Sequence, residues 1–277
     1  MSLDPDWITF LKWALPQLRM RWAGFRKVRG QVQKRVNGRL QALDLAGPSA
    51  YRDYLRQHPG EWQVLDTLCR ITISRFYRDQ GIYALLAGQI MPDLAQQATR
   101  DRQAQLRIWS AGCASGEEPY SLSILWTLQL EQRFPDVTLT ILASDVDRHL
   151  LGRARKACYP CSSLRDLPPA WRDAAFTESA GDYCLQTAFM RPVLLVEHDV
   201  RTPAPATSLH LILCRNLVYT YYERDLQLEI TTRLHAALRP GGVLVLGSHE
   251  TLPVGVTGFT PLPDRHWIYT KALTHSH

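Results

Sequence analysis

The later two thirds of the chain alternate short apolar runs with helical patterns, and this alternation constrains the fold more than any other feature. The first two runs are "LRIWSA" (residues 106–111) and "LTILASD" (residues 139–145). Four more have the same form: "RPVLLVEHD" (191–199), "LHLILCRN" (209–216), "VLVLGSHE" (243–250) and "HWIYTKAL" (266–273). Strands separated by helices predict a mostly parallel sheet covered on both faces. We therefore predict a doubly wound α/β domain.

The first 75 residues have a different pattern, which predicts a small all-helical domain. Apolar residues recur at intervals of three and four from Gly24 to Leu43, as on one face of an amphipathic helix that ends before Gly47-Pro48. A further helix is expected from there to Pro59-Gly60. We expect two domains, a helical one over residues 1–75 and the α/β domain over residues 76–277.

The start of the chain is strongly basic. Between Trp7 and Leu43 there are nine Lys or Arg residues and no Asp or Glu. A positive surface attracts nucleic acid, anionic lipid or an acidic protein face by long-range steering. The alternative is a solvated helix face that is basic without binding anything.

The cysteines and the apolar segments suggest a cytoplasmic protein. No stretch approaches the ~18 uncharged apolar residues of a membrane span, and the chain shows no secretion signal. We therefore expect reduced thiols rather than a disulfide framework. Cys158 and Cys161 form a C-x-x-C pair, but no second pair completes a zinc site, so we expect no metal. The six cysteines are 69, 113, 158, 161, 184 and 214.

Ligands of a doubly wound sheet bind beyond the carboxyl ends of the strands. The loop after Ala111 lacks the G-x-G-x-x-G dinucleotide pattern, and no Lys-Ser/Thr pair follows Gly116 as a phosphate loop requires. Nor is it a nucleophile elbow, because Ser115 lacks the flanking glycines. The polar residues that directly follow the runs are Gly112 to Glu118, Asp145, Asp199, Arg215-Asn216 and Ser248 to Glu250.

Two acids, Glu117 and Glu118, begin the helical pattern after this loop, and Pro119 follows them. Such acids complement the helix dipole, so a purely structural role is one interpretation. They also disfavour a pyrophosphate at the helix N-terminus, so we expect a ligand without phosphate or with positive charge. Asp145 ends a strand, where a carboxylate holds ribose hydroxyls in dinucleotide-binding folds. S-adenosylmethionine, a positively charged nucleoside without phosphate, meets both conditions.

Six ordered motifs make the chain similar to a known family. They are "GFRKVRGQVQKRVNGRLQALDL", "ITISRFYRD", "RIWSAGCASGEEPYSLSIL", "LASDVDRHLLGRARKACY", "LILCRNLVYTYY" and "LRPGGVLVLGSHETL". Over nearly its whole length the chain resembles the CheR-type chemotaxis receptor methyltransferases. The resemblance implies a Rossmann-like methyltransferase sheet after the helical domain, S-adenosylmethionine as cofactor, S-adenosylhomocysteine as product, and methyl transfer to glutamate side chains of chemoreceptors.

The resemblance also implies a set of cofactor-binding residues. Thr72, Ser74 and Arg78 of "TISRFYR" would lie beside the cofactor, where the family usually has Asn-x-Thr-x-Phe-Phe-Arg. Thr72 and Ser74 differ from the family's Asn and Thr, but both keep a hydrogen-bonding side chain. The remaining members would be Gly112 and Glu118 near the methionyl part, Asp145 at the ribose, Asp199 and Val200 around the adenine, and Arg215 and Asn216 near the reacting end.

Arg78 and Tyr219 are the residues that we assign to methyl transfer itself. A guanidinium offers paired donors that match a carboxylate and keeps its charge, so Arg78 is expected to orient the acceptor. The alternative is an ion pair of Arg78 with Asp79 or Glu118. In the family a tyrosine lines the transfer site four residues after the Asn of the C-R-N motif. Thr220 occupies that position here, so Tyr219 would enter by a shift of one residue.

The family's N-terminal domain faces the acidic methylation region of a receptor, and the basic region described above is its counterpart. We expect a monomer that acts on an acidic helical region of a chemoreceptor-like protein and binds no nucleic acid. In the family a small β-subdomain can dock a receptor tail. We expect at most a minimal version of it, at about residues 176–193.

Three other functions stay open. Thr220 is the motive for a methyltransferase of the same fold with a different acceptor. A non-catalytic module could bind the cofactor or its demethylated product and use the basic domain for docking. A nucleic-acid methyltransferase could grip phosphates with the basic start, but the chain lacks an Asn/Asp-Pro-Pro-Tyr/Phe signature.

Overall fold

The computed structural model describes residues 5–273, which form two compact units. The first unit runs to Thr72 and also includes Leu217–Gln227. The second contains Ile73–Asn216 and the chain from Leu228 onward. Residues 217–227 therefore lie outside the unit in which the sequence pattern alone places them, because they pair with the first unit, as described below.

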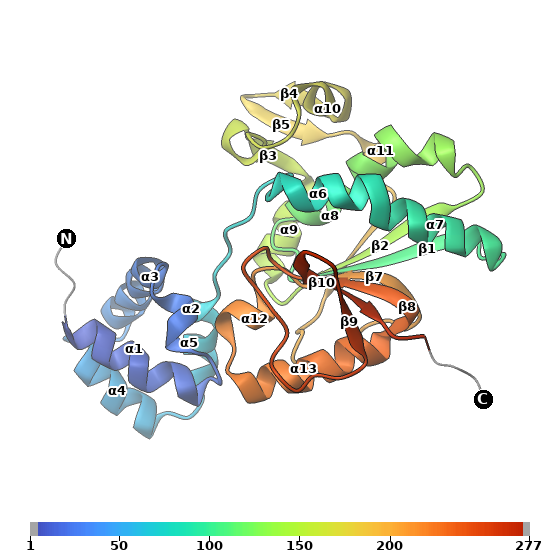
Figure 1. Cartoon of the computed structure of the whole chain (residues 1–277). Helices are drawn as coiled ribbons and strands as arrows, with labels where there is room; N and C mark the ends of the chain where they lie inside the picture. Colours follow the sequence, from blue (N-terminus) through green and yellow to red (C-terminus); the bar gives the residue numbers. More distant parts are fainter. Residues whose placement is uncertain (1–4, 274–277) are drawn as a thin grey trace. The chain divides into compact units, whose positions relative to one another are not determined.

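The first unit is helical, as expected from its sequence (Figure 1). The prediction of a single helix from Gly24 to Leu43 is wrong, because the helix is interrupted between Phe25, the end of α2, and Arg29, the start of α3. Phe25 turns toward Tyr221, with their ring centroids 5.1 Å apart. The helices are α1 (Pro5–Gln17), α2 (Trp22–Phe25), α3 (Arg29–Ala42), α4 (Pro48–Gln57), α5 (Glu61–Cys69) and α12 (Val218–Tyr221).

An ion pair between the partly exposed Arg39 and the buried Glu61 lies beside the apolar stripe of α3. Val32, Val36 and Leu40 are buried, as the helical spacing predicts. Arg39 donates to both carboxylate oxygens of Glu61, at 2.8 and 2.7 Å. The Tyr51 hydroxyl also donates to Glu61, at 2.7 Å. The hydrogen bond from Arg39 is the main cause that lowers the pKa of Glu61. Arg39 is therefore engaged inside the unit.

The second unit is built on a seven-stranded sheet with the order β6-β2-β1-β7-β8-β10-β9. The first five strands in this order are parallel, and β10 and β9 are antiparallel. The predicted doubly wound, mostly parallel sheet is confirmed. The strands are β1 (Gln105–Ala111), β2 (Thr138–Asp145), β6 (Val193–Glu197), β7 (Leu209–Leu213), β8 (Leu238–Val245), β9 (Phe259–Leu262) and β10 (Arg265–Lys271).

Helices cover both faces of this sheet (Figure 1). One face packs against the helices near β1, where Leu106 and Ile108 meet Tyr83, Leu94 and Leu122. The helix α13 lies on the opposite face (Figure 1). The helical elements are α6 (Gln80–Leu85), η1 (Leu86–Ile90), α7 (Met91–Arg100), α8 (Glu117–Leu125), η2 (Trp126–Leu130), η3 (Glu131–Arg133), α9 (Arg148–Lys156), α11 (Thr187–Met190) and α13 (Arg224–Ala237).

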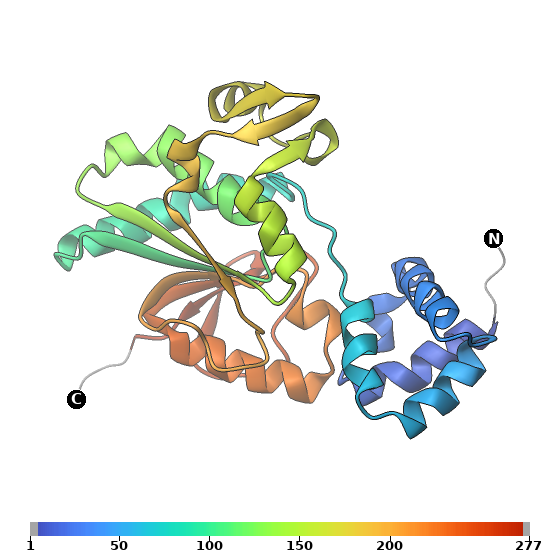
Figure 2. The same cartoon turned by 180° about the vertical axis from the view of Figure 1, so that it is seen from behind.

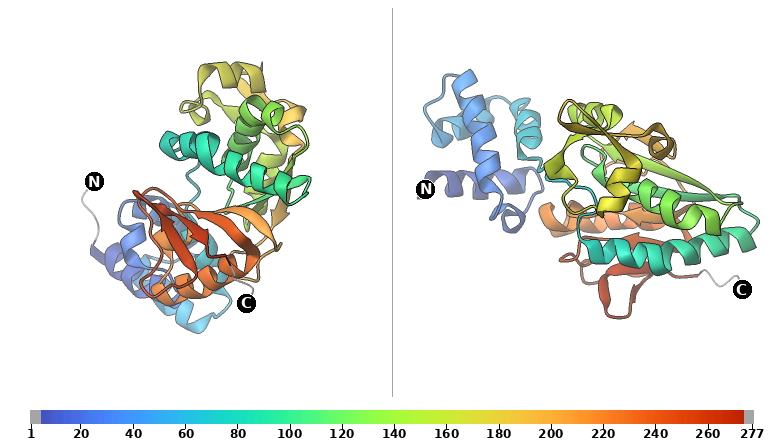
Figure 3. Two further views of the ribbon diagram at one scale, coloured as in Figure 1. Left: turned by 45° about the vertical axis from the view of Figure 1, so that its right-hand side comes forward. Right: turned by 90° about the horizontal axis from the view of Figure 1, so that it is seen from above.

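A separate three-stranded sheet, with the order β3-β5-β4, stands where we expected a minimal β-subdomain (Figure 2). It does not join the large sheet (Figure 3). Its residues Phe176 and Leu185 are buried with Phe76 and Tyr159. Its elements are β3 (Cys158–Pro160), η4 (Cys161–Ser163), α10 (Pro169–Ala175), β4 (Phe176–Ser179) and β5 (Asp182–Leu185).

The expectation that all cysteines are reduced is wrong for one pair. Cys158 and Cys184 form a disulfide, with their Cα atoms 4.0 Å apart. They are direct partners in the register of β3 and β5, so the antiparallel pairing brings the two thiols together. Cys161 is free and exposed. The sequence conceals this bond because 26 residues separate the two cysteines.

A buried histidine joins two strands at the amino end of the sheet. His210 on β7 accepts from the backbone N–H of Arg107 through Nδ1, at 3.1 Å. Because Nδ1 accepts, the proton lies on Nε2, which donates to Gln103 Oε1 at 3.1 Å. Burial, together with Arg239 and Arg107, lowers the pKa of His210 to about 4. The imidazole is therefore neutral in the folded protein.

No helix among residues 5–273 is long and apolar enough to cross a membrane.

His210 predicts an acid-dependent loss of stability. The unfolded state, with a histidine pKa of ~6.5, binds more protons than the folded state between pH ~6.5 and ~4. The free energy of unfolding should therefore fall as the pH falls through this window, by up to about 3 kcal/mol from this residue. Urea unfolding at several pH values should show a shallower pH dependence in His210→Gln than in the wild type. The exposed His149→Gln is the control, and an identical slope in both variants would contradict the prediction.

The cysteines predict a specific labelling pattern. In protein purified without reductant, iodoacetamide should modify Cys161, because it is exposed, and leave Cys158 and Cys184 joined in one peptide pair. Mass spectrometry of a non-reduced digest measures this. Closure of a loop of this length should stabilise the fold by about 3 kcal/mol, so Cys184→Ser should lower the melting temperature. Quantitative alkylation of Cys158, Cys161 and Cys184 without reductant would contradict the Cys158–Cys184 disulfide.

Candidate functional site

The polar residues that follow the strands meet at the carboxyl edge of the large sheet. The strands β6, β2, β1, β7 and β8 are successive neighbours and run in the same direction. Their carboxyl ends therefore form one continuous edge. The predicted residues that this edge brings together are Gly112, Glu118, Asp145, Asp199, Val200, Arg215 and Asn216.

The loop after β1 exposes one glycine between buried neighbours. Gly112 has φ 78° and is exposed, whereas Ala111 and Cys113 are buried. Its N–H donates to the carbonyl of Ser144 at 2.8 Å, which ties the loop to β2. Glycine adopts a positive φ without strain, and because it has no Cβ its backbone remains accessible. The loop thus offers a surface that a ligand can approach closely.

Arg215 is the centre of the polar site. Its guanidinium is 3% exposed and donates to Glu118 Oε2 at 2.9 Å through Nη1. Through Nη2 it donates to Asp79 Oδ2 at 2.7 Å and to the carbonyl of Arg78 at 2.9 Å. The ring of Tyr83 lies 5.7 Å from the guanidinium carbon. Burial lowers the pKa of Arg215, but Glu118, Tyr83 and Asp79 outweigh it, so the pKa is raised overall.

These contacts change the roles expected for Arg215 and Arg78. Glu118 and Asp79 pair with Arg215, so the alternative that Arg78 pairs with either of them is wrong. Arg78 donates instead to the carbonyl of Ile73 at 2.9 Å. Three groups of the protein accept from the Arg215 guanidinium: the carboxylates of Glu118 and Asp79 and the carbonyl of Arg78. Arg215 orients Glu118.

Glu118 is held from two sides and stays partly open. Its Oε1 accepts from the Ser110 hydroxyl at 2.8 Å, and its Oε2 accepts from Arg215. The side chain is 14% exposed. The neighbouring Glu117 is buried and accepts from Ser115 at 2.9 Å, and burial raises the pKa of Glu117. Glu117 is therefore the structural member of the pair, and Glu118 is the accessible one.

Asp145, at the end of β2, joins the loops that follow β1 and β2 through hydrogen bonds to its side chain. Its Oδ2 accepts from the Ala114 N–H, and its Oδ1 accepts from the Asp147 N–H, both at 2.9 Å. Burial raises the pKa of Asp145, whereas the two N–H groups lower it. Each carboxylate oxygen has a second lone pair. The half-buried side chain therefore keeps acceptor capacity for the hydroxyls of a ligand.

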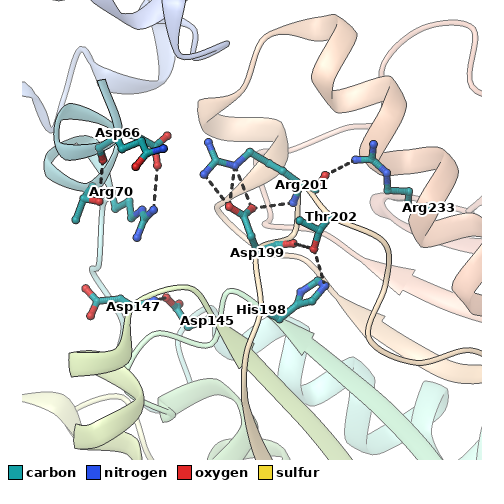
Figure 4. A network of polar contacts seen from close by, with 11 residues as sticks. Asp66, Arg70, Asp145, Asp147, His198, Asp199, Arg201, Thr202 and Arg233 are labelled. Atoms are coloured by element: carbon teal, nitrogen blue, oxygen red, sulfur yellow. Dashed lines mark hydrogen bonds and ion pairs between the residues drawn. The ribbon is translucent and has the colours of Figure 1, made fainter. Parts of the chain in front are cut away.

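Asp199 is fixed by a neighbouring arginine, as Figure 4 shows. Arg201 contacts both carboxylate oxygens of Asp199, at 2.7 to 3.0 Å. Arg233 on α13 donates to the carbonyl of Arg201 at 2.7 Å. Val200 is buried. The loop after β6 is thus held in one conformation, with the carboxylate of Asp199 partly neutralised.

Two of the predicted residues belong to the first unit. Thr72 accepts from Arg35 at 3.4 Å. Tyr219 is buried, and its carbonyl accepts from Arg21. Ser74 and Arg78 belong to the second unit together with Glu118. The structure therefore groups only part of the predicted set.

Two residues outside the predicted cofactor-binding set, Asp79 and Glu250, also support the site. Asp79 has φ 65° and binds Arg215. Glu250 is buried and accepts from the N–H groups of Asn216 and Gly247, both at 2.7 Å. It joins the ends of β7 and β8. The position of Glu250 after a predicted strand indicated a place at the site. For Asp79 there was no indication in the sequence other than its place next to Arg78.

The residues at this edge fit S-adenosylmethionine. The open backbone at Gly112 and the carboxylate of Glu118 suit a cationic methionyl group, and the carboxylate of Asp145 suits ribose hydroxyls. The buried carboxylates around the start of α8 disfavour a phosphate there. Within residues 5–273, no group of three or more His, Cys, Asp or Glu side chains is arranged to hold a metal ion.

Comparisons with known proteins identify the family to which the chain is similar. The family model "CheR methyltransferase, SAM binding domain" matches residues 72–266. The chain is 32% identical over 247 residues to "Chemotaxis protein methyltransferase 2" of Pseudomonas aeruginosa, covering 83% of this chain and 84% of that one. It is 29% identical over 233 residues to the "Chemotaxis protein methyltransferase" of Escherichia coli, covering 80% and 76%. An "Uncharacterized 104.1 kDa protein" of Rhodobacter capsulatus is 30% identical over 240 residues; the chain spans 25% of its length.

Arg215→Lys tests the orienting role. Lysine keeps the positive charge but cannot span Glu118 and Asp79 with a planar fork. S-adenosylmethionine should bind about 10- to 100-fold more weakly, as expected when a hydrogen bond to a charged group worth about 1.5–3 kcal/mol is lost. Isothermal titration calorimetry measures this. The control is Arg239→Lys, which alters an ion pair with Asp101 at the amino end of the sheet. Equal affinity of both variants would refute the role.

Proposed function

This chain belongs to the CheR methyltransferase family and binds S-adenosylmethionine, and from that membership we propose that it forms methyl esters on glutamate side chains of a chemoreceptor-like protein. The membership expected from six ordered motifs is confirmed. The observation that carries the proposal is the Arg215-oriented Glu118 beside the open Gly112 backbone. This arrangement suits a cationic cofactor without phosphate.

The proposed reaction asks for positioning rather than for acid–base chemistry. When bound, the cofactor supplies a methyl group on a positively charged sulfur. A glutamate with a pKa of ~4.3 is already ionised at neutral pH, so no general base is required. The chain's contribution is to align the acceptor, an effect that can supply ~7 to 11 kcal/mol. The Arg78 guanidinium, half-buried and with one donor on Ile73, keeps further donors for a carboxylate.

The first unit supports an acidic partner. Among the nine basic residues between Trp7 and Leu43, three bind groups of the same unit: Arg35 donates to the carbonyl of Arg70, Arg39 binds Glu61, and Arg21 donates to the carbonyls of Tyr219 and Thr220. The exposed members carry positive charge to the surface: Lys12, Arg19, Arg21, Arg26, Lys27 and Lys34. An exposed basic face is complementary to an acidic helical region of a receptor.

Methyl transfer to receptor membranes tests the proposal. Tritiated cofactor incubated with the chain and chemoreceptor-containing membranes should yield label on glutamate that is released by mild base. Asp145→Ala should abolish cofactor binding and labelling, because the loops after β1 and β2 lose their shared carboxylate. The matched control is Asp136→Ala, an exposed aspartate before β2.

The other outcomes separate the alternatives. Base-stable label, or label on another molecule, would replace the glutamate acceptor while keeping the methyltransferase. Cofactor binding without any label on the membranes would favour a docking module. Full activity in Asp145→Ala would show that this carboxylate has been given the wrong role.

A further inference from the structure

The connection between α1 and α2 holds the backbone of the segment that carries Tyr219. Both belong to the first unit. Arg21 donates its N–H to the carbonyl of Tyr221 at 2.8 Å. Its side chain donates to the carbonyl of Thr220 at 3.0 Å and to the carbonyl of Tyr219. Three consecutive carbonyls therefore accept hydrogen bonds from one residue.

The geometry of α12 explains why such a clamp matters. The last four carbonyls of a helix have no partner inside it, and α12 has only four residues, Val218–Tyr221. A helix this short does not maintain itself. A guanidinium at the carboxyl end satisfies the carbonyls and complements the helix dipole. The conformation of α12 thus depends on Arg21.

Gly24 lets the two segments approach. A Cβ on Gly24 would lie 2.1 Å from the carbonyl oxygen of Thr220 and 3.2 Å from the Cα of Tyr221. Real Cβ atoms do not come this close to backbone, so any side chain at this position forces the backbone at 220–221 to move. Gly38 on α3, in the same unit, has nothing within 4 Å of its own Cβ position.

One aromatic contact and one backbone pairing add to the hydrogen bonds of Arg21. Phe25 packs against Tyr221, and Met20 forms an isolated antiparallel bridge with Tyr222. Met20 and Phe25 are buried. The contacts on both sides of Arg21 therefore bind residues 219–222 along their whole length to residues 20–25.

We propose that Arg21 and Gly24 are positioning residues for methyl transfer, which hold α12 in the conformation that the reaction requires. The inference rests on the proposed function, because the family resemblance assigns Tyr219 or Thr220 to the transfer site. It gives the basic N-terminal unit a second role besides contact with the partner. Arg21 holds carbonyls that lie 198 and 199 residues further along the chain.

Gly24→Ala, compared with Gly38→Ala, tests the proposal. The rate constant kcat for methyl ester formation should fall about 10- to 100-fold in Gly24→Ala, as expected for a displacement of about 1 Å in a transfer site. The affinity for S-adenosylmethionine, measured by calorimetry, should stay within twofold of that of Gly38→Ala, because Glu118 and Asp145 belong to the other unit. Arg21→Lys should lose less of kcat than Arg21→Ala, because lysine keeps one charged donor.

Hydrogen exchange gives a readout independent of activity. The N–H groups of Tyr221 and Tyr222, which donate to Leu217 and Val218, should exchange faster in Gly24→Ala and Arg21→Ala than in Gly38→Ala. Should Gly24→Ala fail to fold, the Arg21 variants decide. Unchanged exchange and unchanged kcat in these variants would overturn the proposal. If these variants exchange faster but the wild type forms no methyl ester, the proposed function has failed and Arg21 and Gly24 have only a structural role.

Discussion

One buried guanidinium connects the parts of the chain that form the candidate site. Arg215 follows β7, Glu118 lies in the first turn of α8, and Asp79 precedes α6, so the interaction joins segments that are 97 and 136 residues apart in sequence. Removing a guanidinium from water costs several kcal/mol, and two carboxylates with direct hydrogen bonds offset that cost. The ion pair with Arg215 also orients the Glu118 carboxylate, whose other oxygen accepts a hydrogen bond from the Ser110 hydroxyl on β1. The open face of the site depends on this arrangement.

The sheet could be predicted because its strands appear in the sequence as short apolar runs separated by helical patterns. Each of the runs from "LRIWSA" to "HWIYTKAL" became a strand. The features that could not be predicted depend on contacts distant in sequence. The break before α3 reflects Phe25 meeting Tyr221, and the bond of Cys158 to Cys184 reflects strand register. Neither leaves a local pattern.

The candidate site was predicted in position but not in detail. The rule that ligands meet the carboxyl edge of a parallel sheet located Gly112, Glu118 and Asp145 correctly at that edge. The same rule cannot distinguish a side chain that faces a ligand from one that supports it. Arg215, expected near the reacting end of the cofactor, also orients Glu118 through a direct hydrogen bond. Residue type and spacing contain no information about which of several acids an arginine will choose.

The inclusion of residues 217–227 in the first unit has a consequence for protein engineering. A fragment that begins after Thr72 would carry α12 but leave behind its arginine, its glycine contact and the phenylalanine that covers Tyr221. Apolar surface would then be exposed to solvent. A chimaera with the N-terminal helices of a relative needs three crossover points, after Thr72, before Leu217 and after Gln227, so that residues 217–227 are exchanged together with the helices that they contact.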